Sequence, residues 1–326
     1  MKGPPLGLVA IGLVLTGLFL AGQATSPVPA SAPLAPDAPF TVAMNTATIE
    51  GSPVYVADNG PFGDSFRVIV GGVRSLADGS AHAATNAETQ MLIAGTPKVR
   101  LLLTVAEGLY RVVAKRSSGI RTLADLRGRK IAVPHDTSAH YYLIRLLASA
   151  GVAESEVTLV TTLARDQMAA GVVKGEADAI AMWEPESQNA VDALGSDGIV
   201  FQDNTIYREL FSLYSTTDVL NDARRRRELV GVVRSILVAA DEVKARPKEH
   251  FPVIARTVQQ PEERVARSWV HHAFPMAIPG DLVDVMVDEE VWVARNQRRT
   301  PRTRAALAAL IDASVLAEAR RAVRPR

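Results

Sequence analysis

Residues 130–150 read KIAVPHDTSAHYYLIRLLASA, and this stretch decides the fold. Residues 130–133 are a short apolar run that predicts a buried strand, and the apolar residues at helical spacing over 137–150 predict a helix. Gly151 follows as a stop, because glycine readily adopts the backbone conformation that ends a helix. A strand, a polar turn and a helix in this order predict one unit of a parallel α/β sheet.

The same alternation of apolar runs and amphipathic stretches extends through residues 122–210. Its other predicted elements are a short helix at 122–126, a strand at 157–161, a helix at 166–174, a strand at 177–182, a helix at 185–194 and a strand at 199–202. The flanking segments predict strands at 40–44, 67–70, 99–104, 109–115 and 211–217 and helices at 52–59, 72–78 and 87–93. The chain therefore predicts an α/β fold with a largely parallel sheet.

Beyond Asp218 the pattern becomes helical, with helices predicted at 222–245, 248–257, 262–271, 281–297 and 302–322. The predicted fold class is α/β with two lobes, built on mixed, mostly parallel sheets and carrying an all-helical C-terminal extension. Lobe 1 is predicted to comprise residues 40–118 and 215–326, and lobe 2 residues 119–214. Two crossing segments, near 113–121 and 211–218, would join the lobes around a cleft, which is a common place for a small-molecule site.

The first forty residues predict export. Lys2 precedes an apolar run over 6–22 and small residues follow, so residues 1–24 are assigned as a signal peptide. The run is about 25 Å long as a helix, which falls short of the ~30 Å hydrocarbon core and favours cleavage. Residues 25–39 hold five prolines and predict a semi-extended linker. The predicted location is periplasmic, with tethering to the inner membrane if the signal stays uncleaved.

The composition excludes several classes of protein. Hydrophobic residues make up 48% of the chain and charged residues 22%, which is typical of a globular protein. The formal net charge is +1, so we expect no nucleic-acid partner. The chain has no cysteine, and it shows no zinc-binding helix motif, phosphate loop, dinucleotide glycine pattern or nucleophile elbow. The sequence therefore predicts no metal, no cofactor and no catalysis.

The polar turn before the helix at 137–150 is the clearest candidate site. Thr137 and Ser138 stand where the first backbone N–H groups of the helix lack intrahelical partners and where the helix dipole is positive. Such a turn can hold an anion without any lysine. The alternative is that Asp136 or Thr137 only caps the helix.

Three further polar turns follow predicted strands or apolar runs. Thr46 lies after the first strand, Asn86 and Glu88 follow the apolar run at 81–84, and Trp183 with Glu184 follows the strand at 177–182. Open α/β sheets bind ligands at the carboxyl ends of their strands, so these residues are candidate ligand contacts. The alternatives are that Thr46 lies in an ordinary turn, that Trp183 belongs to the core and that Glu184 is a first-turn acid that only complements a helix dipole.

Two longer segments resemble a known family. TLADLRGRKIAV at 122–133 with TSAHY at 137–141, and VKGEADAIAMWEP at 173–185, are similar to hallmarks of the substrate-binding proteins of nitrate, sulfonate and taurine type ABC importers. SPVYVAD at 52–58 resembles the segment before the first ligand loop of that family. The resemblance implies a type II periplasmic binding fold, binding without turnover, an ABC permease as partner and a monomeric state.

The resemblance also implies roles for the candidate residues. The implied anion-holding turn is Thr137, Ser138 and His140, the lobe 2 wall is Trp183 and Glu184, and the lobe 1 contribution is Asn86 and Glu88. The two acids would repel a bare anion, so a zwitterion such as taurine is the expected ligand.

Three alternatives stay open at this point. The ligand could be an aminopyrimidine vitamin precursor, to which acids beside an aromatic ring are suited. The chain could be a membrane-tethered ligand sensor. It could also be an enzyme on the same fold, with His135, Asp136 and His140 as acid–base groups.

Overall fold

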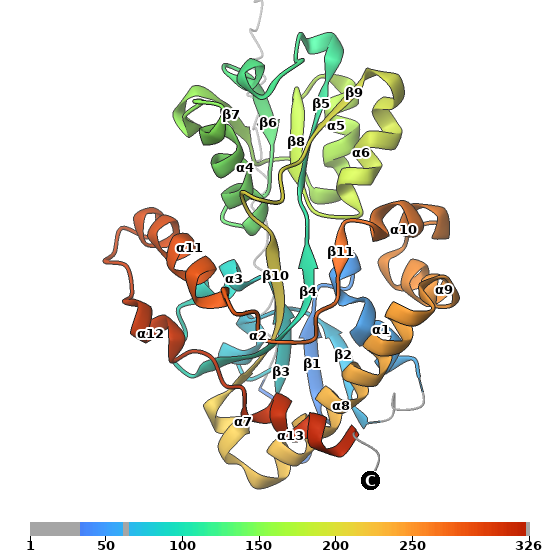
Figure 1. Cartoon of the computed structure of the whole chain (residues 1–326), viewed down its shortest axis with the longest axis vertical. Helices are drawn as coiled ribbons and strands as arrows, with labels where there is room; N and C mark the ends of the chain where they lie inside the picture. Colours follow the sequence, from blue (N-terminus) through green and yellow to red (C-terminus); the bar gives the residue numbers. More distant parts are fainter. Residues whose placement is uncertain (1–32, 61–64, 324–326) are drawn as a thin grey trace, which may run out of the picture. The chain divides into compact units, whose positions relative to one another are not determined.

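The computed structural model describes residues 33–60 and 65–323. The described residues belong to one compact unit, which holds both sheets of the fold (Figure 1). The predicted signal peptide, 1–24, and the first part of the predicted linker, 25–39, lie outside the described residues. Within the described part of the chain, every helix is too short or too polar to cross a membrane.

The first sheet has the strand order β11-β4-β10-β3-β1-β2. Its strands are β1 (Thr41–Met44), β2 (Arg67–Val70), β3 (Ala83–Asn86), β4 (Val99–Gly108), β10 (Glu209–Thr216) and β11 (His272–Ala273). β1 pairs in parallel with β2 and β3, whereas β10 runs antiparallel to β3 and β4. The carboxyl ends of β1 and β3 therefore share one edge of the sheet, where the polar turns at 45–48 and 86–90 begin.

Helices cover both faces of the first sheet because side chains of a strand alternate between its faces. Val42 and Met44 of β1 belong to one hydrophobic cluster, and Ala43 belongs to another. The first cluster takes in α1 (Ser52–Asp58), α8 (Ala223–Ala245), α9 (Pro247–Val258), α10 (Glu262–Trp269) and α13 (Ser314–Val323). The second takes in α2 (Arg74–Ala77), α3 (Glu88–Ala94), α11 (Leu282–Asn296) and α12 (Arg304–Ala308).

The second sheet has the order β7-β6-β8-β5-β9 and forms lobe 2. Its strands are β5 (Arg111–Lys115), β6 (Lys130–Ala132), β7 (Thr158–Val160), β8 (Ala179–Met182) and β9 (Gly198–Phe201). β6 is parallel to β7 and β8, and β5 is antiparallel to β8 and β9. The strand–turn–helix unit predicted at 130–150 is confirmed as β6 followed by α4 (Ser138–Ser149).

Helices again cover both faces of this sheet. Leu143 and Leu147 of α4 pack with Ile131 of β6, whereas α5 (Met168–Lys174) and α6 (Glu186–Leu194) contribute to the cluster of Ala132. Short 3-10 turns complete the described helices, namely η1 (Ile49–Gly51), η3 (Arg116–Ser118), η4 (Leu123–Leu126), η5 (Glu154–Glu156), η6 (Arg165–Gln167) and η7 (Gly195–Asp197). The α/β class with mixed sheets is as predicted.

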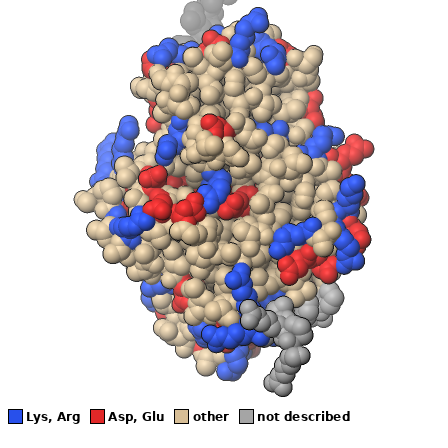
Figure 2. Space-filling view, viewed as in Figure 1, with Lys and Arg blue, Asp and Glu red and all other residues tan. Residues whose placement is uncertain are grey.

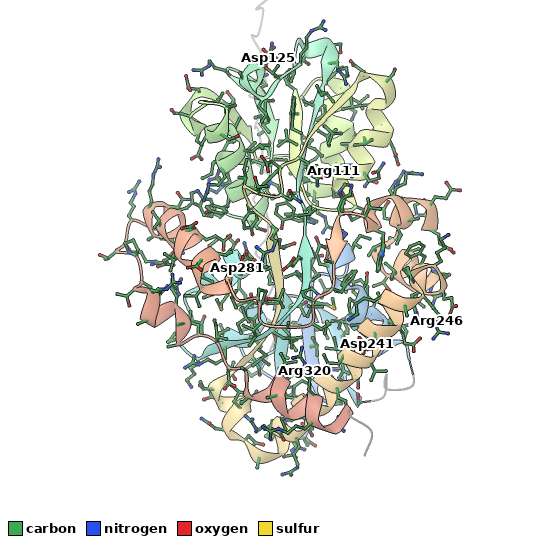
Figure 3. The ribbon with its side chains drawn as sticks, viewed as in Figure 1. Arg111, Asp125, Asp241, Arg246, Asp281 and Arg320 are labelled. Carbon is green, nitrogen blue, oxygen red and sulfur yellow. The ribbon has the colours of Figure 1, made fainter. Side chains whose placement is uncertain are left out.

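The lobes join at different residues from those expected. β5 lies in the second sheet and β10 in the first, so the chain crosses near 109–110 and again near 202–208. The expected boundaries, 118/119 and 214/215, placed both strands in the wrong lobe. β4 and β5 are consecutive apolar strands separated by two residues, and such a pattern does not tell which sheet each strand joins. Figure 3 shows Arg111 at this crossing.

The C-terminal helices follow the prediction with two corrections. The helix expected at 302–322 is two helices, α12 and α13, because Ile311 between them makes a parallel bridge to Leu101 of β4. The helix expected at 262–271 ends at Trp269, and His272 starts β11 instead of following His271 on a helix. α7 (Thr217–Asn221) links β10 to α8.

β3 is a strand that the sequence pattern missed. Its residues, Ala83 to Asn86, carry no β-branched or aromatic side chain except Thr85, so strand propensity is weak. Pairing with β1 on one side and β10 on the other decides the conformation.

Charged side chains of both signs are interspersed over the face of the molecule shown in Figure 2. Near mid-height, acidic side chains flank a small basic group. This mixture agrees with the formal net charge of +1 for the whole sequence.

Candidate functional site

A cleft of about 160 Å³ lies where β1 and β3 end and α4 begins. Both lobes contribute to its walls. The lining residues are Asn45, Thr48, Glu50, Asn86, Ala87 and Gln90 of lobe 1, Glu209 and Phe211 of β10 in the same lobe, and Thr137, Ser138 and Trp183 of lobe 2. None of these eleven residues is Lys or Arg.

The lobe 2 wall is the start of α4. The Thr137 hydroxyl donates to the carbonyl of Pro134 at 2.7 Å and accepts from the backbone N–H of His140 at 3.4 Å. The hydroxyls of Ser138 and Tyr110 are hydrogen-bonded at 2.7 Å. These contacts hold a twelve-residue helix with its N-terminus at the cleft, where the first-turn N–H groups and the dipole favour an anionic group.

The lobe 1 wall presents side-chain amides at the carboxyl ends of β1 and β3. Asn86 Oδ1 accepts from the N–H of Ala87 at 3.0 Å, which fixes the amide in the turn. Gln90 Nε2 donates across the cleft to the carbonyl of Asp136 at 2.8 Å. Arg165 of lobe 2 donates to Asn45 Oδ1 at 3.3 Å. The two lobes are therefore already in contact on both sides of the cleft.

The floor of the cleft is acidic. Glu50 and Glu209 are buried, and both carboxylates lie against Gly108, where an added Cβ would be 2.8 Å from Glu209 Oε2 and 3.2 Å from Glu50 Oε1. Burial raises the pKa of Glu209 well above its usual range, and the charges of Glu50 and Glu88 raise it further. His272 Nε2 lies 3.4 Å from Glu50 Oε1. This pair of acids is suited to a cationic group.

Buried polar atoms without a partner collect at this cleft. Within the described residues, no hydrogen-bond partner is found for Thr48 Oγ1, Glu50 Oε1 and Oε2, Trp183 Nε1 and Glu209 Oε2. Burying a polar group without a hydrogen bond costs about 1–3 kcal/mol, so such atoms are rarely left together without a reason. A polar ligand with both donors and acceptors would satisfy them.

The structure divides the eight predicted site residues into two sets. Asn86, Thr137, Ser138 and Trp183 line one cleft, although they come from three separate segments. The other four lie outside its walls, namely Thr46, Glu88, His140 and Glu184. Thr46 lies in the turn after β1, and its neighbours Asn45 and Thr48 line the cleft instead.

Glu88 is held in a buried network beside the cleft. Its Oε1 accepts from the Tyr207 hydroxyl at 2.8 Å and its Oε2 from the N–H of Leu210 at 2.9 Å. Burial raises the pKa of Glu88 to about 7, against the hydrogen bonds that favour its charged form. Glu88 therefore connects α3 to β10 and to Tyr207 in the segment that crosses between the lobes.

We expect this raised pKa to make stability depend on pH. The folded chain keeps the Glu88 proton up to about pH 7, whereas the unfolded chain releases it near 4.5, so stability falls as pH rises between these values and levels off above them. The slope is up to about 1.4 kcal/mol per pH unit. Glu88→Gln should flatten the fall in melting temperature from pH 5 to pH 7.5, and the surface control Glu318→Gln should not. Equal slopes in all three proteins would contradict this assignment.

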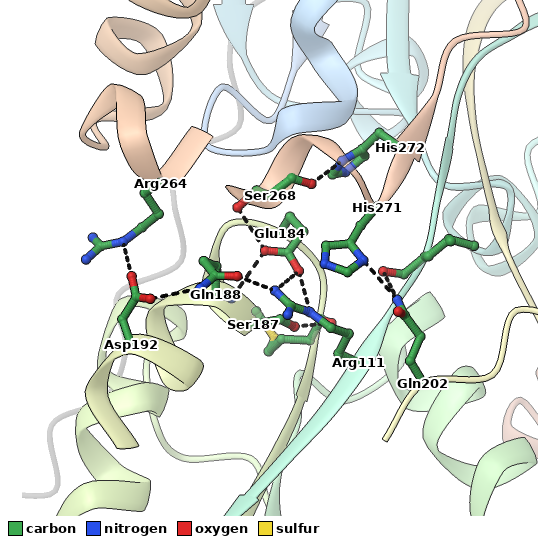
Figure 4. A network of polar contacts seen from close by, with 12 residues as sticks. Arg111, Glu184, Ser187, Gln188, Asp192, Gln202, Arg264, Ser268, His271 and His272 are labelled. Carbon is green, nitrogen blue, oxygen red and sulfur yellow. Dashed lines mark hydrogen bonds and ion pairs between the residues drawn. The ribbon is translucent and has the colours of Figure 1, made fainter. Parts of the chain in front are cut away.

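Glu184 lies in a second buried network, drawn in Figure 4. Arg111 Nε donates to Glu184 Oε1 at 2.8 Å, and Ser268 of α10 donates to Glu184 Oε2 at 3.0 Å. Close by, Asp192 of α6 pairs with Arg264 at 3.2 Å and Arg267 at 2.7 Å. Because α6 belongs to lobe 2 and α10 packs on lobe 1, these contacts connect the lobes.

We expect Asp192→Asn to weaken the closed arrangement of the lobes. Partly exposed ion pairs contribute about 0–1 kcal/mol each, so the affinity for a cleft ligand should fall about fivefold. The radius of gyration of the ligand-free variant should also increase in small-angle scattering, and a saturating cleft ligand should reverse the increase. Asp197→Asn, which removes a carboxylate bonded to Ser117 within lobe 2, is the control. An unchanged radius and affinity for Asp192→Asn would exclude this role.

The sequence pattern did not identify several residues that line the cleft. The most important of these for ligand binding are Glu50 and Glu209. Glu50 lies four residues beyond Thr46, between the polar turn and the helix expected at 52–59. Glu209 begins a strand that was expected in the other lobe. The pairing of β10 with β4 places Glu209 opposite Gly108. A glycine at the end of a long apolar strand is the one local signal that another group approaches the backbone closely at this position.

The fold and the cleft define a two-lobed protein of the periplasmic binding protein fold. The model of the family described as NMT1/THI5 like matches residues 70–250, more than half of the chain. The chain belongs to this family.

Two curated relatives come from Escherichia coli strain K12. A putative aliphatic sulfonates-binding protein is 26% identical over 51% of this chain and 51% of its own length. A taurine-binding periplasmic protein is 29% identical over 40% of each chain. The chain thus spans about half the length of the curated relatives it matches.

Solved structures share the fold over most of the chain. The alkanesulfonate-binding protein of Xanthomonas axonopodis pv. citri, bound to MOPS, has a TM-score of 0.63 at 18% identity and covers 84% of this chain and 97% of its own. A desulfurization enzyme has a TM-score of 0.61 at 13% identity and covers 87% of this chain and 100% of its own. The curated relatives are binding proteins, whereas the fold also hosts an enzyme.

Proposed function

We propose that this protein is the solute-binding component of an ABC importer and that it captures a small zwitterion of the taurine type in the cleft between its lobes. It would work as a periplasmic monomer and deliver the solute to an inner-membrane permease. The names of the two curated relatives support this function.

One observation carries the proposal. The two ends of the cleft are suited to opposite charges, one end to an anionic group and the other to a cationic group. The start of α4, with Thr137 and Ser138, is suited to a sulfonate or carboxylate. Glu50 and Glu209 on the floor are suited to an ammonium group. The expected preference for a zwitterion thus rests on Glu50 and Glu209, in place of Glu88 and Glu184.

Binding without turnover is part of the proposal. His135, Asp136 and His140, the residues considered for acid–base chemistry, are not among those that line the cleft. Thr137 and Ser138 are hydrogen-bonded, and no base is paired with either hydroxyl in the described contacts. Incubation with taurine should therefore leave the compound intact.

A thermal-shift panel tests the proposed function. Taurine, ethanesulfonate, nitrate, bicarbonate, an aminophosphonate and an aminopyrimidine are compared at equal concentration. A ligand at 100 times its Kd stabilises a protein by about 2.7 kcal/mol, which shifts the melting temperature visibly. We expect taurine to give the largest shift. No shift with any compound would overturn the proposed ligand class.

An aminopyrimidine is the second candidate, favoured by one observation. Trp183 and Phe211 line the same cleft as Glu50 and Glu209, so a flat cationic ring could stack on an aromatic face while the acids bind its amino group. A larger shift with the aminopyrimidine than with taurine would select this ligand.

A further inference from the structure

A group of three potential metal ligands lies at the turn that leads into α4. His135 and Asp136 precede the helix, and His140 lies in its first turn. One nitrogen of each imidazole and one carboxylate oxygen all lie within 4.8 Å of one another. Nδ1 of His135 is 3.1 Å from Oδ2 of Asp136. The spacing in sequence matches no common metal motif, and the fold of the turn brings the three together.

His140 supplies an independent sign of a ligand. Its side chain is 1% exposed, and its Nε2 lies 3.0 Å from Oε1 of Glu154. Its Nδ1 is buried and has no hydrogen-bond partner within the described residues. A carboxylate that accepts from one imidazole nitrogen leaves the lone pair on the other, which is the arrangement found behind metal-bound histidines.

The other two side chains can adjust to an ion. His135 and Asp136 are about half exposed, so their rotamers are not fixed by packing. Ligands at about 2.0–2.1 Å from a tetrahedral Zn²⁺ lie roughly 3.4 Å apart, so the present spacing of up to 4.8 Å would have to contract by at most about 1.4 Å. Asp136 has φ of 54°, a conformation that costs a residue other than glycine of order 1 kcal/mol and that persists at functional sites.

A hollow beside the three ligands gives an ion access. It measures about 260 Å³ and is lined by His135 and Asp136 of lobe 2 and by Trp292 and Asn296 of lobe 1, among others. The edge of His140 packs against the Trp292 ring at a centroid distance of 5.3 Å, which restricts the imidazole. The hollow leaves room for water at a fourth coordination position.

We propose that His135, Asp136 and His140 form a binding site for a divalent transition-metal ion, with Glu154 as the residue that orients His140. Two imidazoles and one carboxylate are a ligand set that Zn²⁺ accepts readily. The site is separate from the solute cleft and stands whether or not the proposed function is correct.

Titration with ZnCl2 tests the site, with untagged, EDTA-treated protein in a calorimeter. We expect one Zn²⁺ per chain with a Kd in the micromolar range or below. His135→Ala should weaken binding at least tenfold, and because His135 is exposed the variant should keep its melting temperature. Glu154→Gln should weaken binding by about 10–100-fold.

His250→Ala is the matched control, because His250 also has a buried, unpartnered imidazole nitrogen, on α9, but lies outside the group of three. It should bind Zn²⁺ as the parent protein does. The absence of stoichiometric binding would overturn the proposal, and so would equal Zn²⁺ affinity in His135→Ala and the parent.

Discussion

We expect Ser138→Asp to abolish measurable taurine binding, with a loss of affinity of at least about 100-fold. Ser138 is buried at the first position of α4, so its replacement sets a carboxylate where the anionic end of the solute is expected. Two like charges about 4 Å apart repel each other by roughly 4 kcal/mol near a protein surface. An acid at a helix start stabilises the helix, so the variant should still fold.

Two controls separate charge from shape in this experiment. Ser138→Ala removes the hydroxyl that bonds Tyr110 but adds no charge, and its affinity should fall less than tenfold. Ser196→Asp introduces the same charge at an exposed serine outside the cleft and should leave binding unchanged. Calorimetric titration with taurine measures all three variants. If Ser138→Asp binds within threefold of the parent, the start of α4 does not hold the anion.

The fold could largely be predicted because its main unit, the strand, turn and helix at 130–150, is formed by residues that are adjacent in the sequence. The strand at 130–133, the polar turn and the helix at 137–150 are each encoded by adjacent residues, and so is the position of Thr137 and Ser138 at the helix start. Residues at a strand–helix turn need no tertiary information to be placed at the edge of a sheet. The boundary between the lobes could not be predicted from adjacent residues, because it depends on which sheet each of the two strands β4 and β5 joins.

The glutamates in and around the cleft show a second limit of prediction from the sequence. Glu88 and Glu184 follow β3 and β8, but their side chains turn inward to Tyr207 and Arg111. The direction of a side chain at a strand end depends on packing partners far away in the sequence. Glu50 and Glu209 are brought together by the pairing of β10 with β4, which no local pattern records.

The acidic floor of the cleft predicts a second large effect, on the preference for taurine over ethanesulfonate. Glu50→Gln should weaken taurine binding by about 30-fold or more, because removal of the carboxylate leaves a buried ammonium group without its counter-charge, at a cost of about 2–5 kcal/mol. Ethanesulfonate lacks the ammonium group, and its affinity should stay the same or increase. The ratio of the two affinities, measured by calorimetry, reports the role of Glu50 directly.

Glu209→Gln should change that ratio much less than Glu50→Gln does, by about threefold or less. Burial and the neighbouring acids raise the pKa of Glu209 well above its usual range, which favours the protonated carboxyl that a glutamine imitates. Glu107→Gln, which removes a carboxylate paired with Arg208 outside the cleft walls, controls for a general loss of charge and should leave the ratio unchanged. If taurine and ethanesulfonate weaken equally in Glu50→Gln, the acid pair supports the structure of the cleft and does not bind the ammonium group. If Glu209→Gln has the larger effect instead, the charge of the pair lies on Glu209.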